Sequence, residues 1–199
     1  TKSAYWFRLN LENNSEKALD KVLELSKARL NYVNFYQIDM TGQVKSYSTG
    51  DLLPFSSRPY HSRFFVLPVN IPAQSKMTFF VRVQSESSLV IPLKLWSPNA
   101  FYTNERLSYA FQAMYFGLAI GMILLNLLIF ISIKDSSYLL YAGLASSLVF
   151  SITALNGLQK EFLPFDSELY FRIASPSGFA IAQVFALYFL LNMLKTWNS

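Results

Sequence analysis

The residues most able to do chemistry gather in the stretch GDLLPFSSRPYHSRFFVLPVNIP, residues 50–72. It holds an acid, Asp51, two arginines that include Arg58, and the only histidine of the chain, His61, among aromatics and prolines. Guanidinium forks hold hydroxyls or a carboxylate and aromatic faces stack on sugar rings, so this stretch could bind a sugar. The alternative is structural: Gly50 permits a turn, Asp51 caps it, and Arg58 pairs with Asp51 inside the loop.

A second set of candidate binding residues comes from two alternating segments. In AYWFRLNLE, Trp6 and Arg8 lie opposite an all-apolar set, and in TFFVRVQ the same holds for Arg82. The apolar residues predicted to be buried on the opposite faces are Phe7, Leu9, Phe79 and Val81. Side chains alternate between the faces of a strand, so these three residues are predicted to point away from the core. An outward Trp between arginines could form a glycan-binding surface. The alternative is an ordinary outer face on which arginine stems cover an exposed Trp.

Catalytic and metal sites are not expected. The sequence has no cysteine and a single histidine, His61, so a thiolate site is excluded and a zinc site or a Ser–His–Asp triad would depend on that one residue. No G-x-S-x-G segment occurs. We therefore predict no enzyme, no catalytic residue, no metal and no cofactor within these 199 residues.

Short strands must position the candidate residues. Period-two alternation predicts strands at about residues 4–12, 32–40, 43–49, 63–71, 78–84 and 89–96. The segment KALDKVLELSKARL (17–30) could be helical, but the strand spacing around it favours a strand. Internal prolines such as Pro68 and Pro92 indicate edge strands or bulges. Seven or eight strands in about 100 residues predict an antiparallel jelly-roll sandwich over residues 1–101.

The second half of the chain has a different composition. Residues 1–107 hold 13 Lys/Arg and 8 Asp/Glu, whereas residues 108–199 hold 4 and 4. Its uncharged stretches are longer than the roughly 20 apolar residues that a helix needs to cross a bilayer. We expect a membrane domain over residues 102–199, with spans at about 108–133, 136–158 and 173–194. The basic residues of the first half form no run or stripe, so nucleic-acid binding is not expected.

The connections set the geometry of these spans. Lys134-Asp135 is a two-residue break that can join only antiparallel helices. The lysines and arginines of the short loops do not favour either orientation. Segment 99–106 is expected to join the sandwich stiffly to the first span, with Thr103 or Asn104 as the helix cap.

Small and polar residues in the first span predict close helix packing. Gly117 and Gly121 form a G-x-x-x-G, and Asn126 is a candidate for an interhelical hydrogen bond. Packing inside a helix bundle is the favoured interpretation, and homodimerisation is the alternative. The spans carry ionisable residues only at their ends, which argues against an ion or proton pathway.

The order of segments resembles one family. YWFRLNLEN, NFYQIDMTG, the 50–72 stretch and TFFVRVQSESSLVIPLKLW are followed at once by YFGLAIGMILLNLLIFISIKDSSYLLYAG. This order is similar to that of the bacterial seven-transmembrane receptors with diverse intracellular signalling modules, with their second type of extracellular domain. The resemblance implies a carbohydrate-binding-module-like sensor domain outside the cytoplasm, seven spans, and a cytoplasmic diguanylate cyclase or histidine kinase. It also implies that this chain is a piece of a longer protein, with the N-terminus out, Lys134-Asp135 in and loop 160–172 out.

Receptor function is therefore the leading hypothesis. The sandwich is expected to bind a small ligand, with a glycan as the leading class, and to signal through helices in the bacterial inner membrane. The expected partners are this ligand, the lipid bilayer and a second copy of the chain. The alternative is an adhesion protein whose helices only anchor a glycan-binding or partner-binding sandwich; a transporter with an accessory domain is a third hypothesis.

Overall fold

A computed structural model describes residues 3–39, 41–85, 90–163 and 167–197, with side chains described up to residue 194. The predicted strand ends at residues 40 and 89 lie outside these ranges. The elements are, in order, β1 (Ala4–Asn13), β2 (Leu19–Leu25), β3 (Tyr32–Ile38), β4 (Val44–Thr49), η1 (Phe55–Ser57), β5 (Phe65–Ile71), β6 (Ser75–Gln84), β7 (Leu93–Trp96), α1 (Pro98–Ile133), α2 (Ser136–Leu155), α3 (Leu158–Phe162) and α4 (Glu168–Trp197).

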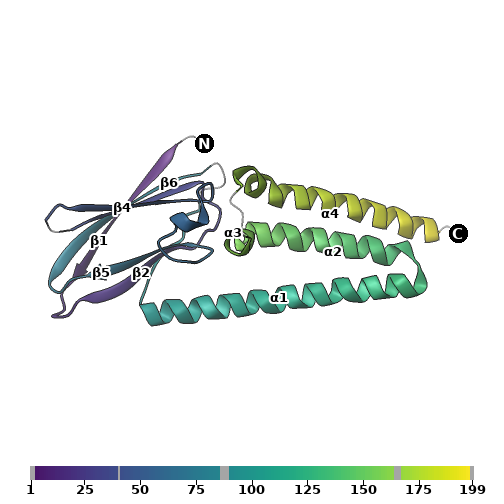
Figure 1. Ribbon diagram of the computed structural model, residues 1–199, viewed down its shortest axis with the longest axis horizontal. Coiled ribbons are helices and arrows are strands. Elements are labelled where there is room, and N and C mark those ends of the chain that lie inside the picture. The colour runs from purple at the N-terminus through teal and green to yellow at the C-terminus, as the bar shows by residue number, and fades with distance from the viewer. Residues whose placement is uncertain (1–2, 40, 86–89, 164–166, 198–199) are drawn as a thin grey trace. The chain divides into compact units, whose positions relative to one another are not determined.

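Two antiparallel sheets form the predicted β-sandwich (Figure 1). One has the strand order β1-β6-β3-β4 and the other the order β5-β2-β7. The ambiguous segment 17–30 supplies β2, the central strand of the smaller sheet, so the strand interpretation is confirmed. Pro68 lies on the edge strand β5, where a missing backbone donor is tolerated, whereas Pro92 precedes β7 and lies outside any strand.

The core between the sheets comes from the apolar positions that alternate along the strands. Phe35, Phe79 and Val81 are at most 1% exposed and belong to a single cluster with apolar residues of both sheets. The prediction that Phe7 is buried is wrong, because its side chain is 36% exposed. β1 is the edge strand of the four-stranded sheet, and the opposing sheet has only three strands, so fewer side chains are available to cover β1.

The first long helix begins earlier than predicted. It starts at Pro98, directly after Ser97, and the Phe101 amide donates to the Ser97 carbonyl at 3.0 Å. Proline suits the first helical position, since its missing N–H would have no helical partner there. Thr103 is therefore inside the helix rather than at its cap, and its hydroxyl donates back to the Asn99 carbonyl at 2.9 Å.

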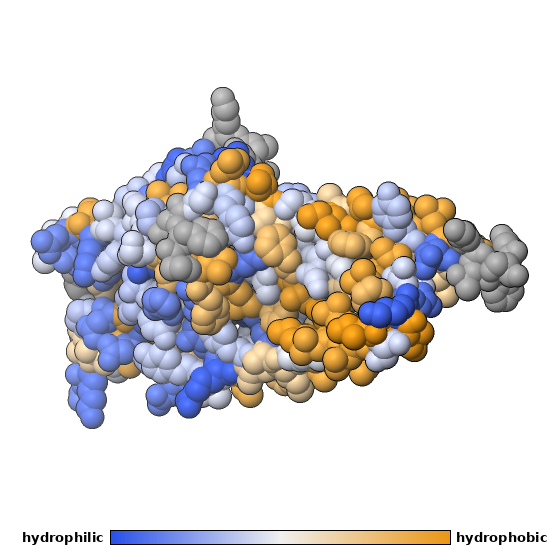
Figure 2. All heavy atoms as spheres, turned by 45° about the vertical axis from the view of Figure 1, so that its right-hand side comes forward, coloured by the Kyte–Doolittle hydropathy of each residue, from blue (hydrophilic) through white to orange (hydrophobic). Residues whose placement is uncertain are grey.

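Three helices of the described residues are long and apolar enough to cross a membrane. They are α1, α2 and the part of α4 that ends at Leu194, which confirms an α-helical transmembrane region after the sandwich. The turn between α1 and α2 consists of Lys134 and Asp135, as expected, with Lys134 at a positive φ of 61°. Figure 2 shows apolar surface over the long helices and mostly polar surface over the strands.

The chain divides into two compact units, and the division does not follow the sequence. One unit holds residues 1–104 together with residues 156–168, and the other holds residues 105–155 and 169–199. Residues 156–168, here called the connector, link α2 to α4 and include α3. The connector is therefore packed as part of the sandwich unit, which alternation and hydropathy did not predict.

Candidate ligand-binding site

The outward face of the β1-β6-β3-β4 sheet carries three of the four sequence-predicted binding residues. Strand register aligns them in rows across the sheet. From one end to the other the rows are Ala4, Gln84, Tyr32; Trp6, Arg82, Asn34, Ser48; Arg8, Phe80, Tyr36, Ser46; Asn10, Thr78, Ile38, Val44; and Glu12, Lys76. We call this set the platform. It brings three of the predicted residues together: Trp6, Arg8 and Arg82.

Aromatic contacts fix the platform side chains from strand to strand. The ring of Trp6 stacks on that of Tyr36, with centroids 5.6 Å apart and an interplanar angle of 23°. Trp6 nevertheless remains 57% exposed, so much of the ring is open to solvent. The Arg8 guanidinium lies over the Phe80 ring at 5.9 Å. An exposed, laterally supported indole is a rigid surface on which the apolar face of a ring can stack.

A chain of hydrogen bonds holds the polar part of the platform. The Arg82 Nη1 donates to Asn34 Oδ1 at 3.3 Å, and its Nη2 donates to Gln84 Oε1 at 2.9 Å. Asn34 Nδ2 in turn donates to Ser48 Oγ at 2.8 Å. These bonds orient the guanidinium before any ligand arrives, which lowers the entropic cost of a further hydrogen bond.

Arg58, predicted as a further binding residue, lies elsewhere. It is only 8% exposed, and its guanidinium is between the rings of Phe55 and Phe65, 4.7 and 4.8 Å from their centroids. Its Nη1 donates to the Ser62 carbonyl within the same loop. These contacts favour a structural role for Arg58 inside the loop. They are made with Phe55, Phe65 and Ser62, so the predicted pairing of Arg58 with Asp51 stays a prediction. His61 packs edge-on against Phe55 at 4.6 Å.

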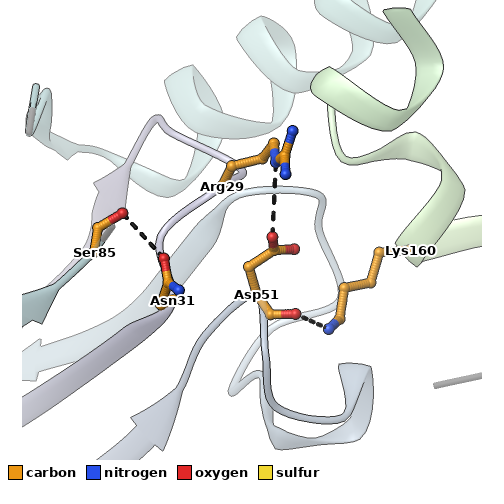
Figure 3. A network of polar contacts seen from close by, with 5 residues as sticks. All are labelled: Arg29, Asn31, Asp51, Ser85 and Lys160. Carbon is orange, nitrogen blue, oxygen red and sulfur yellow. Dashed lines mark hydrogen bonds and ion pairs between the residues drawn. The ribbon is translucent and has the colours of Figure 1, made fainter. Parts of the chain in front are cut away.

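The Gly50–Asp51 turn is built around close backbone approach. A Cβ on Gly50 would lie 2.1 Å from the Asn31 carbonyl oxygen, so only glycine fits. The Asp51 amide donates to the Leu30 carbonyl at 2.7 Å. Figure 3 shows that the Asp51 carboxylate faces Arg29, with 3.9 Å between Oδ2 and Nε, and that Lys160 reaches its backbone carbonyl.

The connector contacts the Gly50–Asp51 turn. Lys160 Nζ donates to the Asp51 carbonyl oxygen, and Lys160 is 5% exposed. Gly157 adopts a positive φ of 76°, and a Cβ there would lie 2.6 Å from Ala28 Cβ. Sequence analysis does not predict this contact, because nothing in the local sequence marks a partner 109 residues away.

Burial dominates the electrostatics of this turn. Desolvation raises the pKa of Asp51 above its ordinary value of 3.8, while Lys160, Arg29 and Arg58 act in the opposite direction. The charges of three basic groups therefore only partly offset the cost of burying the carboxylate. Asp51 contacts both the turn and the connector, and sequence analysis did not predict the second contact. The loop-structural role of Gly50 and Asp51 stays a prediction.

A separate hollow of about 400 Å³ lies on the outer face of the smaller sheet. Its walls include Tyr60, Phe101 and Tyr102, and Asn70 Nδ2 donates to Asp20 Oδ1 at 2.7 Å on the same surface. Phe101 belongs to the first turns of α1 and is buried against apolar residues of β2 and β5. Sequence analysis missed this hollow because its walls come from strands, a loop and a helix.

Within the membrane helices, the close contacts involve other glycines than those predicted. A Cβ on Gly143 would lie 2.5 Å from the Phe185 ring, and one on Gly178 would lie 2.2 Å from Ser151 Oγ, so α2 and α4 approach closely. A Cβ on Gly117 or Gly121 meets no described atom within 4 Å. Asn126 bonds its own helix at the Met122 carbonyl, at 2.8 Å. The packing role of Gly117, Gly121 and Asn126 thus stays a prediction.

Comparisons with known families cover nearly the whole chain. Residues 1–97 match the family described as 7TMR-DISM extracellular 2, and residues 108–199 match the family described as 7TM diverse intracellular signalling. No curated protein and no solved structure matches the chain. Both matched domains are sensor or receptor domains rather than catalytic ones. Across the described residues no group of three His, Cys, Asp or Glu could hold a metal ion.

The two matches occur in the order of an extracellular domain followed by membrane helices, which is also the order of the sandwich and the long helices. The chain therefore belongs to the seven-transmembrane receptors with diverse intracellular signalling, and it comprises their second type of extracellular sensor domain and part of their membrane domain.

Proposed function

We propose that the platform is the sensor surface of this receptor and that it binds a small extracytoplasmic ligand, a glycan. The observation that carries the proposal is the arrangement of Trp6: it is stacked on Tyr36, 57% exposed, and in register with Arg82, whose guanidinium is already oriented by two hydrogen bonds. A rigid apolar ring beside fixed hydrogen-bond donors matches the two surfaces of a sugar, its C–H face and its hydroxyl edge.

The proposed signal passes from the sandwich to the membrane helices by two routes. Only Ser97 separates β7 from α1, so displacement of the sheet reaches the first span without a flexible linker. The second route is the connector, which Lys160 holds to the Gly50–Asp51 turn and which continues into α2 and α4. A ligand shifts the helices only if it binds two arrangements of the receptor unequally.

The output belongs to a part of the receptor outside this chain. We propose a cytoplasmic module of the diguanylate cyclase or histidine kinase class and a location in the bacterial inner membrane. The buried contact between connector and turn supports a receptor over a simple anchor, because an anchor does not require a buried lysine to join two spans to its binding domain.

Three variants of the full chain in lipid nanodiscs test the site: Trp6→Ala, Arg82→Ala and Arg58→Ala. Binding to a panel of saccharides is titrated on the same samples whose melting temperatures are recorded. We expect the first two to weaken binding by about 1–3 kcal/mol with little change in melting temperature. Arg58→Ala should lower the melting temperature first, because its guanidinium is packed inside the loop. Unchanged binding in Trp6→Ala and Arg82→Ala would place the site elsewhere, with the hollow beside Tyr60 and Tyr102 as the next surface to test.

A further inference from the structure

We infer that the platform selects an acidic saccharide, one that carries a carboxylate or sulfate group next to the ring that stacks on Trp6. This inference rests on the proposed function, since it names the class of ligand for the same surface. The observation that supports it is the excess of positive charge on the platform. Neither ring stacking nor binding of hydroxyls requires this excess.

The central rows of the platform hold two positive charges and no acid. Arg82 and Arg8 occupy adjacent rows, and no other platform residue in the four rows between Ala4 and Asn10 is ionised at neutral pH. The single acid among the platform residues, Glu12, lies in the last row and pairs with Lys76 at 3.5 Å. The net charge of +2 is therefore concentrated beside the exposed ring of Trp6.

The two guanidinium groups are close enough to share a ligand. Trp6 pairs with Arg82 and Arg8 with Phe80, so the two arginines are diagonal neighbours on adjacent strands. Cβ atoms in such a diagonal relation lie about 7 Å apart, well within the combined reach of two arginine side chains. A single carboxylate or sulfate between them would attract both guanidinium groups and offset part of the repulsion between them.

The donors needed for such a group remain after the internal contacts are made. A guanidinium has five N–H donors, and the hydrogen bonds of Arg82 to Asn34 and Gln84 use two of them. Arg8 is exposed, and its described contact is with the face of Phe80, which leaves the edge of the guanidinium open. Planar, forked donors of this kind bind carboxylates through paired hydrogen bonds, which a neutral hydroxyl cannot match.

The test uses the full chain in nanodiscs of zwitterionic lipid and three disaccharide probes. They are a uronic-acid disaccharide, its neutral methyl ester and a sulfated disaccharide, and each is titrated by quenching of intrinsic fluorescence and by calorimetry. The variants are Arg8→Gln and Arg82→Gln. Lys94→Gln is the matched control, because Lys94 also lies over an aromatic ring, that of Trp96 at 5.7 Å, but on the other sheet.

We expect an acidic disaccharide to bind about tenfold or more tightly than the methyl ester, and this ratio to shrink as salt rises. The ratio should fall in Arg8→Gln and in Arg82→Gln, since each removes one of the two charges, and stay unchanged in Lys94→Gln. Trp6→Ala should weaken acid and ester by the same factor, since it removes stacking and no charge.

The outcomes separate the two proposals. Equal binding of acid and ester by the original chain overturns the acidic class and leaves the platform as the ligand site. A preference for the acid that persists in both arginine variants also overturns the inference, because residues other than Arg8 and Arg82 would then bind the acidic group. Failure of all three probes to bind overturns the acidic class, and failure of the neutral saccharide panel as well overturns the proposed function.

Discussion

Lys160 Nζ donates a hydrogen bond to the backbone carbonyl oxygen of Asp51, although 109 positions separate the two residues in the sequence. The bond joins the connector between α2 and α4 to a turn of the sandwich, within one compact unit. The Gly50–Asp51 turn belongs to a stretch that resembles a binding loop in the sequence. In the structure this turn also binds the connector.

Lys160→Met should lower the stability of the sandwich unit by about 1–3 kcal/mol, because it leaves a part-buried carbonyl without its charged donor. The control is Lys134→Met, which removes an exposed lysine from the other end of α2 and should change stability by less than about 0.5 kcal/mol. Thermal unfolding of the full chain in nanodiscs, followed by near-ultraviolet circular dichroism, measures both. Equal melting temperatures for the two variants would show that the contact contributes nothing to stability.

Comparison of Gly157→Ala with Gly42→Ala separates the cost of backbone strain from the cost of a close side-chain contact. Gly157 and Gly42 both have positive φ, 76° and 82°, but only Gly157 has a neighbour, Ala28 Cβ, that an added Cβ would meet at 2.6 Å. Gly42→Ala should therefore cost about 1–2 kcal/mol from strain alone. Gly157→Ala should cost about 1–3 kcal/mol more, because the connector must move away from the sandwich. Denaturant unfolding gives both values, and a smaller cost for Gly157→Ala would contradict the packing described above.

The stability of the sandwich unit should carry a pH-dependent component from Asp51. A carboxyl whose pKa is raised by folding contributes stability that is complete below its unfolded pKa, near 3.8, and is lost as pH rises through the folded pKa. Asp51→Asn lacks this component. The melting temperature of the original chain minus that of Asp51→Asn should therefore fall as pH rises above 3.8, the ordinary pKa of the carboxyl. A difference that rises with pH would mean that Arg29 and Lys160 outweigh burial.

Two phenylalanines of the sandwich should respond very differently to truncation. Phe79 is 1% exposed and Phe7 is 36% exposed, although both occupy the core-facing side of neighbouring strands. Phe79→Ala should cost about 3–5 kcal/mol and Phe7→Ala about 1 kcal/mol or less. Phe79→Asp should be more damaging than Phe79→Ala, because it buries an unpaired charge. Chemical denaturation that ranks Phe7→Ala with Phe79→Ala would contradict the position of β1 at the sheet edge.

Membrane topology can be tested with single cysteines, since the chain has none of its own. We expect Asp135→Cys to be protected from an impermeant thiol reagent in intact cells and to react once the cells are opened. Ser46→Cys, on the exposed outer face of β4, should react in both cases. Labelling of Asp135→Cys in intact cells would reverse the proposed orientation.

The sequence by itself determined the fold class and the faces of the strands. Alternation places Phe79 and Val81 in the core and Trp6, Arg8 and Arg82 outside, because strand geometry is local and each residue can point only to one of two faces. Uncharged length likewise reveals the helices that can cross a membrane, since the bilayer imposes that requirement on each helix separately.

Only the tertiary structure decided the properties that depend on neighbours distant in the chain. The exposure of Phe7 follows from the position of β1 at a sheet edge, and strand order is not encoded in alternation. The burial of Arg58 between two rings and of Lys160 against Asp51 depends on which segments the fold brings together. A charged side chain in a loop has the same local sequence signal whether it lies in water or in a buried contact, because its environment is made by residues it meets only after folding.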